Sequence, residues 1–163
     1  MNHSSEQSNT YLSFYLGEEL FGANVKHILE VLKGETITEI PRSEEFIEGI
    51  INFRGEIVTV IDFQKKLNMP IPNQQEKEII IVVELHSDEK TALIGLLADQ
   101  VRKVFSMNNS ELKPVPEFGN YYNPEFLTGV AKTNDGLVMI LDVEKVLSEA
   151  DVQLIIETNN QDK

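Results

Sequence analysis

The sequence contains no cysteine, and its basic residues are few beside its acidic ones. The lack of cysteine excludes disulfides, thiolate metal sites and a cysteine nucleophile. The 163 residues include 14 Lys and Arg against 27 Asp and Glu, for a net charge of −13. Binding to phosphate groups needs clustered Lys and Arg, so we expect no nucleic-acid partner. The same charge opposes adsorption to an anionic membrane surface.

Long hydrophobic runs are also missing. The longest, at residues 79–83 and 96–98, fall far short of the ~20 residues that a membrane span requires. Residues 1–10 are polar and lack the apolar core of a signal peptide. We therefore expect a cytoplasmic location and no direct membrane insertion.

Motifs for catalysis and ligand binding are scarce. His3, His27 and His86 share no metal-ligand spacing. No serine lies in a nucleophile elbow, and no glycine-rich loop is placed to bind a phosphate. We expect no catalytic residues, no metal and no cofactor.

What the sequence does contain is a strong hairpin pattern at residues 46–62. β-Branched and aromatic residues on both sides of Arg54-Gly55 favour two strands joined by a tight turn. Asp62 then stands where its side chain can accept amide protons from a short helix at residues 63–67.

The same pattern occurs twice. Residues 46–67 align with residues 126–147 at a constant offset of 80, without a gap, and earlier segments repeat at offsets of 75 and 73. The repeat predicts a mainly β protein of two similar five-stranded SH3-like barrel lobes with short helices, because closing a small barrel protects strand edges. The positions identical between copies are Phe46/Phe126, Gly49/Gly129, Val58/Val138, Asp62/Asp142, Lys65/Lys145 and Leu67/Leu147.

The boundaries follow from this repeat. We predict a single domain at residues 11–151, with one lobe at about 11–70 and the other at about 78–151. Residues 1–10 and 157–163 are predicted to be flexible tails.

Two local predictions accompany these boundaries. Residues 24–33 suit either a helix or a buried strand, and comparison with residues 101–107 favours a helical turn leading into a strand in both copies. Residues 143–151 are predicted to form a helix.

Arg54 differs from the rest of the hairpin because the second copy has Asn134 in its place. Its guanidinium can order the turn by bonding carbonyls or a carboxylate, or it can simply be solvated at the hairpin tip. Both alternatives stay open at this point.

The stretch from Gly49 to Asp62 resembles the signature of the CheW-like chemotaxis coupling proteins, Gly-Val-x-Asn-Leu-Arg-Gly-x-x-x-Pro-Val-x-Asp-Leu. Residues 14–22, 28–31, 38–41 and 129–142 are similar to that family as well, so the resemblance spans roughly Tyr11 to Leu147. Phe53 replaces the family's leucine, and Thr59 replaces its proline. Thr59 restores an amide donor, so this strand can pair where proline could not.

The resemblance implies two intertwined five-stranded lobes without enzymatic activity. It also implies an adaptor that links the cytoplasmic tips of chemoreceptors (methyl-accepting chemotaxis proteins) to the histidine kinase CheA, whose regulatory domain shares the fold. Carried over position by position, the implied partner-binding residues are Ile28, Glu30, Gly49, Asn52 and Arg54.

Two other hypotheses remain. One is a scaffold of the same fold that binds a CheA-like kinase in another pathway, such as surface motility. The other is a small β-barrel enzyme that uses the loop carboxylates Glu44, Glu45 and Asp88, which requires convergent acids with perturbed pKa values.

Overall fold

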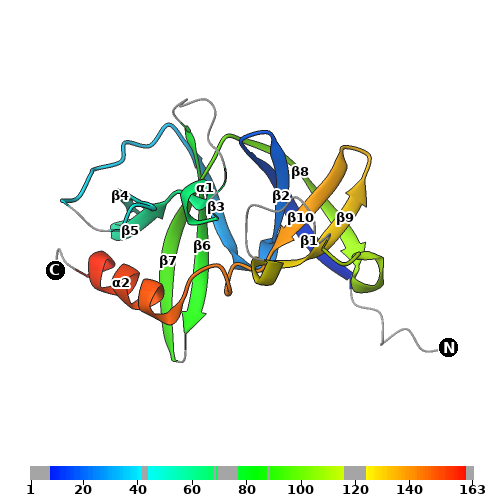
Figure 1. Cartoon of the computed structure of the whole chain (residues 1–163). Helices are drawn as coiled ribbons and strands as arrows, with labels where there is room; N and C mark the ends of the chain where they lie inside the picture. Colours follow the sequence, from blue (N-terminus) through cyan, green and yellow to red (C-terminus); the bar gives the residue numbers. More distant parts are fainter. Residues whose placement is uncertain are drawn as a thin grey trace.

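The computed structural model describes residues 8–41, 44–67, 69, 77–87, 89–115 and 124–160. Two five-stranded sheets lie side by side (Figure 1), which confirms the prediction of a mainly β fold with two similar lobes. The first sheet has the order β8-β1-β2-β10-β9. Its strands are β1 (Ser8–Leu16), β2 (Glu19–Asn24), β8 (Gln100–Asn108), β9 (Leu127–Thr133) and β10 (Gly136–Leu141).

The second sheet has the order β3-β6-β7-β5-β4. Its strands are β3 (Ile28–Lys33), β4 (Ile47–Phe53), β5 (Glu56–Ile61), β6 (Ile79–Ser87) and β7 (Lys90–Ala98). Helices are short and lie between or after the strands: α1 (Phe63–Lys66), α2 (Glu149–Asn159) and the 3-10 turns η1 (Val25–His27), η2 (Asn109–Glu111) and η3 (Pro124–Phe126).

Each sheet combines strands from both copies of the repeat. The hairpin β1–β2 joins β8, β9 and β10 of the second copy, and the hairpin β6–β7 joins β3, β4 and β5 of the first. The predicted division into lobes at about 11–70 and 78–151 is therefore wrong, whereas the intertwined arrangement implied by the family resemblance is what the topology shows.

The exchange is visible at two repeated glycines. Gly22 of the first copy pairs with Ile140 of the second, and Gly95 of the second copy pairs with Val60 of the first. Both pairings are parallel. A Cβ at Gly22 would lie 3.0 Å from Ile140 Cδ1, and one at Gly95 would lie 2.7 Å from Ile80 Cγ2. Glycine is needed here because the strand packs closely against a neighbouring side chain.

Three hydrophobic clusters hold the sheets together. The largest lies between the sheets and includes Phe14 and Phe21 of the first sheet with Ile81 and Ile94 of the second, all fully buried. A smaller cluster fills each lobe; Val60 belongs to that of the second sheet. The cluster of the first sheet contains Tyr11, Leu20, Ala131, Val138 and Ile140. Burial of the apolar side chains in these clusters is the main stabilising contribution to the fold.

The predicted termini need correction. Ser8, Asn9 and Thr10 belong to β1 and pair with β8, and residues 1–7 lie outside the described part. At the other end, α2 continues to Asn159, and Thr158 is buried. Residues 157–159 are therefore part of a packed helix rather than a flexible tail, because the buried face of α2 reaches its last turn.

Two helix predictions are also wrong in part. Residues 143–147 form turns, and the helix begins only at Glu149 after the Ser148 cap. The first copy has the predicted helical turn and strand, as η1 and β3, but the second passes from β7 to β8 through Asp99 alone. A single residue leaves no room for a helical turn.

The cap predicted at Asp62 is confirmed, and the repeated Asp142 makes a similar contact. Asp62 Oδ1 accepts hydrogen bonds from the amides of Gln64 at 2.9 Å and Lys65 at 3.4 Å, and α1 follows. Asp142 Oδ1 accepts from the Glu144 amide at 3.2 Å at the start of the turns. The repeated aspartate is therefore architectural in both copies.

Candidate partner-binding site

The family-like hairpin β4–β5 closes through a two-residue turn at Arg54-Gly55. Both residues have positive φ, 52° and 84° respectively. Positive φ at both central positions defines a type I′ turn, whose twist matches that of the flanking strands. The Asn52 side chain supports the turn, because its Oδ1 accepts the Gly55 amide at 3.0 Å.

Arg54 is ordered by two contacts while most of its side chain stays in solvent. Its Nη2 donates to Glu30 Oε1 on β3, and its guanidinium lies 4.7 Å from the centroid of the Phe53 ring. The side chains of Arg54 and Glu30 are 65% and 39% exposed. Of the two alternatives for Arg54, the structure shows the one in which it bonds a carboxylate.

This contact joins the two edges of the second sheet. β3 and β4 stand at opposite ends of the strand order, so the ion pair between Glu30 and the β4–β5 turn requires the sheet to curl until its edges meet. An exposed ion pair contributes little to stability, about 0–1 kcal/mol. The pair is therefore a charged, partly exposed feature at the tip of the hairpin.

The two remaining predicted site residues lie apart from this contact. Gly49 adopts φ 153°, and a Cβ there would lie 2.3 Å from the Thr38 carbonyl oxygen. Thr38 and Ile50 exchange backbone hydrogen bonds of 2.9 Å beside it. Ile28 packs against the cluster between the sheets. The structure therefore brings Glu30, Asn52 and Arg54 together and places Gly49 and Ile28 in supporting positions.

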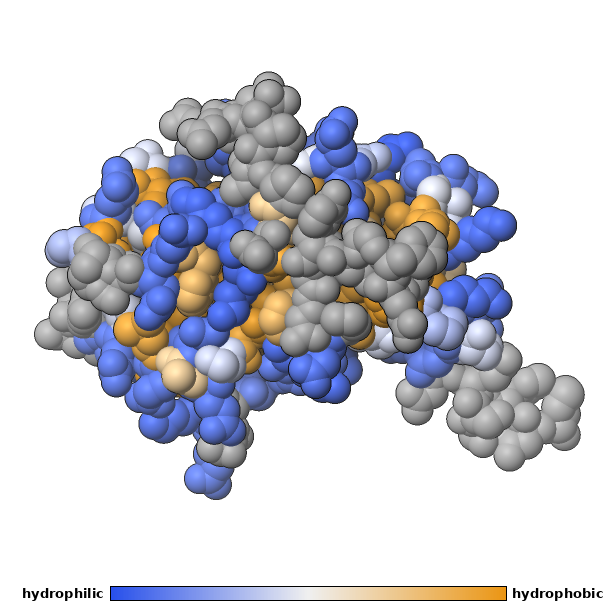
Figure 2. All heavy atoms as spheres, in the orientation of Figure 1, coloured by the Kyte–Doolittle hydropathy of each residue, from blue (hydrophilic) through white to orange (hydrophobic). Residues whose placement is uncertain are grey.

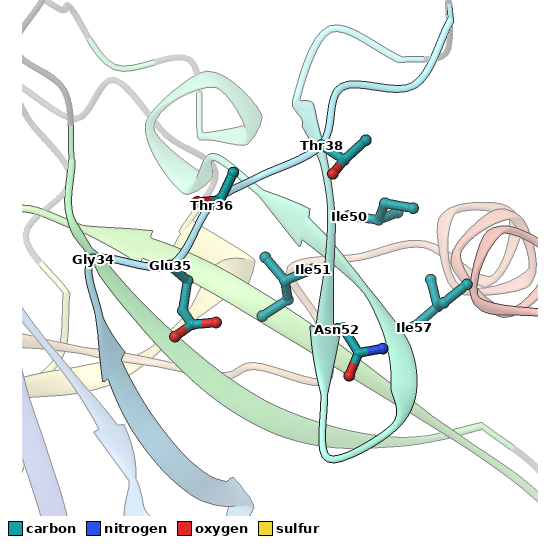
Figure 3. Close-up of a pocket in the computed structure, with 8 residues that line it drawn as sticks. All are labelled: Gly34, Glu35, Thr36, Thr38, Ile50, Ile51, Asn52 and Ile57. Atoms are coloured by element: carbon teal, nitrogen blue, oxygen red, sulfur yellow. The ribbon is translucent and has the colours of Figure 1, made fainter.

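A shallow cleft of about 480 Å³ opens beside the hairpin. Residues of the segment after β3 form one wall, and residues of β4 and β5 form the other (Figure 3). The lining residues are Gly34, Glu35, Thr36, Thr38, Ile50, Ile51, Asn52 and Ile57. Sequence reasoning identified only Asn52 among them, since nothing local marks Glu35 or Thr36 as neighbours of β4.

Apolar side chains also reach the surface of both sheets. Leu29 and Val31 on β3 are 43% and 39% exposed, and on the first sheet Val104 and Leu137 are 60% and 59% exposed. Figure 2 shows hydrophobic residues emerging between strips of hydrophilic ones on the face it draws. Such a mixed surface suits a protein interface better than a buried catalytic pocket.

Few groups have shifted pKa values in this region. Burial lowers the pKa of His27, which precedes Ile28, and the Glu144 carboxylate only partly opposes that effect. Glu44 and Glu45 are exposed, and Asp88 lies outside the described residues. Among the residues that the structure describes, no group of three or more His, Asp or Glu side chains is placed to hold a metal ion. No helix in that part is long and apolar enough to cross a membrane.

The two curled sheets with exchanged strands, and the charged hairpin on one of them, define the class of this protein: a β scaffold with surface features suited to protein partners. Residues 10–151 match the family model for the CheW-like domain. The chain belongs to the CheW-like family.

Named relatives agree with this assignment. The chain is 29% identical over 145 residues to the chemotaxis protein CheW of Klebsiella aerogenes, covering 89% of this chain and 85% of that protein. It is 30% identical over 145 residues to the chemotaxis protein CheW of Thermotoga maritima, covering 87% and 89%. The crystal structure of the scaffolding protein TtCheW from Thermoanaerobacter tengcongensis superposes with a TM-score of 0.77 at 31% identity, covering 95% of this chain and 98% of that one.

Thr59, which stands where the family signature has proline, contacts the C-terminal helix. The amide that Thr59 restores donates to Oδ1 of Asn159 in α2 at 2.9 Å. It was predicted to serve strand pairing, whereas it contacts the C-terminal helix. Asn159 lies in the segment predicted to be a tail, so no pattern in the sequence pointed to it.

Proposed function

We propose that this chain is a non-catalytic adaptor that couples the cytoplasmic tips of chemoreceptors to the regulatory domain of a CheA-type histidine kinase. Membership of the CheW-like family supports a chemotaxis scaffold role. The observation that carries the finer proposal is the hairpin tip, where Arg54 is held by Glu30 and still presents most of its surface to solvent. Partner binding then takes place on the cytoplasmic side, within receptor arrays.

The physical reason is preorganisation. A type I′ turn, the Asn52–Gly55 hydrogen bond and the ring of Phe53 hold the guanidinium in one place. A side chain that is already ordered loses less conformational entropy when a partner binds. A guanidinium also carries free donors that match a carboxylate or backbone carbonyls on a partner.

The test is binding of the purified chain to the kinase regulatory domain and to a receptor-tip fragment, measured separately. Arg54→Glu places two carboxylates together at the tip, and we expect the dissociation constant for at least one partner to rise by tenfold or more. Lys132→Glu is the matched control, because Lys132 is an exposed cation on β9 of the other sheet. Wild-type protein that binds neither partner would refute the proposal.

A charge-exchanged variant sharpens the result. Arg54→Glu combined with Glu30→Arg restores an ion pair between β3 and the β4–β5 turn, with reversed polarity. If the pair only closes the sheet, this double variant regains wild-type affinity. If Arg54 contacts a partner, as we propose for the coupling surface, its affinity stays low. Binding to a kinase of another pathway in preference to a chemotaxis kinase would favour the alternative scaffold function.

A further inference from the structure

Helix α2 connects the two lobes. It follows β10 of the first sheet but packs on the second, beside β5 and β7 (Figure 1). Val152, Ile155 and Thr158 are buried along it. At its first turn, Lys66 Nζ donates to Asp151 Oδ2 at 2.6 Å, and Lys66 follows β5 in the chain. The helix is therefore fixed to the second sheet at its start.

Its last turn is fixed by one carboxamide. Asn159 Oδ1 accepts hydrogen bonds from Thr59 N at 2.9 Å and from Thr59 Oγ1 at 2.7 Å. Asn159 Nδ2 donates to the carbonyl oxygen of Leu93 at 3.0 Å. Thr59 lies on β5 and Leu93 on β7, so one side chain bridges the backbones of two strands. Thr59 is fully buried, and the loss of a hydrogen bond costs most at a buried group.

The bridge lies where the two strands separate. β5 and β7 pair in parallel only from Thr59–Ile94 to Ile61–Leu96. Before Thr59, the strand runs on as residues 56–58, which pair with β4 but not with β7. That projecting part is the arm of the hairpin whose turn carries Arg54. On β4, Ile50 pairs with Thr59 from one side. Asn159 thus holds the base of the projecting hairpin from the other side of Thr59.

We propose that Asn159 is a positioning residue: by bridging Thr59 and Leu93, it makes the C-terminal helix hold the β4–β5 hairpin and hence the Arg54–Glu30 contact in place. The main contacts of the helix are with β5 and β7, so its effect on the hairpin turn passes through β5. Loss of the bridge removes a constraint on β5, so the hairpin opens more often. Ile51, Phe53 and Val58 of the hairpin pack in the cluster of the second sheet, so this opening disturbs that cluster and leaves the cluster of the first sheet intact. Only the partner-binding readout of this proposal rests on the proposed function.

The primary test is amide hydrogen exchange of the whole chain, comparing Asn159→Ala with wild type. We expect exchange in residues 50–58 to accelerate about tenfold or more, while exchange in β1, β2 and β10 stays within about twofold. Asn160→Ala is the matched control, since Asn160 is exposed and makes only backbone hydrogen bonds to the helix among the contacts described. Equal acceleration in both sheets would show general destabilisation and overturn the proposal.

Conservative variants separate the contacts. Asn159→Asp keeps the acceptor for Thr59 and loses the donor to Leu93, so we expect intermediate acceleration. Thr59→Val keeps the amide donor and loses the hydroxyl, and it is also expected to be intermediate. Combining Thr59→Val with Asn159→Ala should add little to Asn159→Ala alone, because both remove members of one bridge. Fully additive effects on hairpin exchange would contradict a shared bridge.

A second readout links the bridge to partners. Asn159→Ala is expected to weaken binding of the kinase regulatory domain or the receptor-tip fragment three- to tenfold, with the Asn160→Ala control unchanged. Suppose that Arg54→Glu weakens binding of a partner. If Asn159→Ala then accelerates hairpin exchange but leaves the affinity for that partner unchanged, the positioning role is overturned. If wild type binds neither partner, the proposed function fails, and hydrogen exchange still decides whether Asn159 positions the hairpin.

Discussion

Arg54 and Asp135 occupy the turns of the two repeated hairpins and carry opposite charges. Arg54 pairs with Glu30 on β3. Asp135 accepts a hydrogen bond from Arg102 Nη2 at 2.8 Å, and its other carboxylate oxygen lies 3.1 Å from Lys103 Nζ, both on β8. β3 and β8 hold equivalent edge positions in the two sheets. Each sheet is therefore joined edge to edge by an ion pair, and the polarity is reversed between the lobes.

The first prediction concerns the stability contribution of the Arg54–Glu30 pair. Because both side chains are well exposed, we expect Arg54→Ala to lower the free energy of unfolding by no more than about 1 kcal/mol. Urea unfolding followed by circular dichroism measures this. A loss of about 3 kcal/mol or more would show that the pair closes the lobe energetically and that any binding defect is secondary.

The second prediction concerns the pH dependence of the ion pairs that Asp135 forms in the first sheet. Hydrogen bonds from Lys103 and Arg102 lower the pKa of Asp135 below its usual value. The unfolded chain, with an aspartate pKa near ~3.9, then binds this proton more readily than the folded one. The stabilising contribution is present above that pKa and is lost as pH falls through the lower folded value.

Unfolding of wild type and Asp135→Asn between pH 7 and pH 3 checks this. We expect wild type to be the more stable protein at neutral pH and the difference to shrink below about pH 4. Glu56→Gln, at an exposed carboxylate in the other hairpin, serves as the control. A difference that grows on acidification would have the wrong sign for a carboxylate held in its charged form.

The third prediction tests whether Gly49 is architectural. A Cβ at Gly49 would approach the Thr38 carbonyl oxygen to 2.3 Å, whereas one at Gly129 would lie 3.0 Å from the Lys113 carbonyl oxygen. Gly49 also has a positive φ, which alanine tolerates poorly. We expect Gly49→Ala to cost more than about 2 kcal/mol and Gly129→Ala clearly less. Equal thermal shifts for the two variants would contradict this account.

The fourth prediction concerns the start of α2. Burial raises the pKa of Asp151, but hydrogen bonds from Lys66 and from the Ser148 amide outweigh that effect, so its pKa is lowered overall. Asp151 also completes a capping box with Ser148. Asp151→Ala removes both contacts, and we expect a loss of about 1–3 kcal/mol.

Comparison with Ser148→Ala and Lys66→Ala, each of which removes only part of this arrangement, separates the cap from the ion pair. Each single change is expected to cost about 1 kcal/mol. Asp151→Ala should therefore exceed either of them in urea unfolding. If Asp151→Ala costs no more than Ser148→Ala, the Lys66 contact contributes nothing measurable.

Much of the site was predictable because it lies in one short segment. Asn52, Arg54 and Gly55 are close in sequence, and the glycine favours the tight turn that the sequence predicts. The positive φ of Arg54 is not a local preference of arginine. Glu30, like Asn52, was assigned to the site only from the family resemblance, and its contact with Arg54 spans the curl of a whole sheet. The cleft wall at Glu35 and Thr36 was missed for the same reason.

Neither the ion pairs of Asp135 nor the Asn159 bridge is indicated by any local sequence pattern. Asp135 reads as an ordinary turn residue, and its two cations lie more than thirty positions away. Asn159 follows an apolar run in a stretch that resembled a tail. Side-chain bridges of this kind depend on where a helix docks, and docking is a property of the packed surfaces rather than of the segment.

By itself, the sequence determined the local structure: the strands, the hairpin turn, the capping aspartates and the existence of two equivalent units. These follow from interactions between residues a few positions apart. Which copy pairs with which was decided only in three dimensions, because strands of either copy carry the same pattern and can form the same ladders. β7 and β8 are separated by Asp99 alone, too short for even a two-residue hairpin turn. β8 therefore passes into the other sheet, where it pairs with β1.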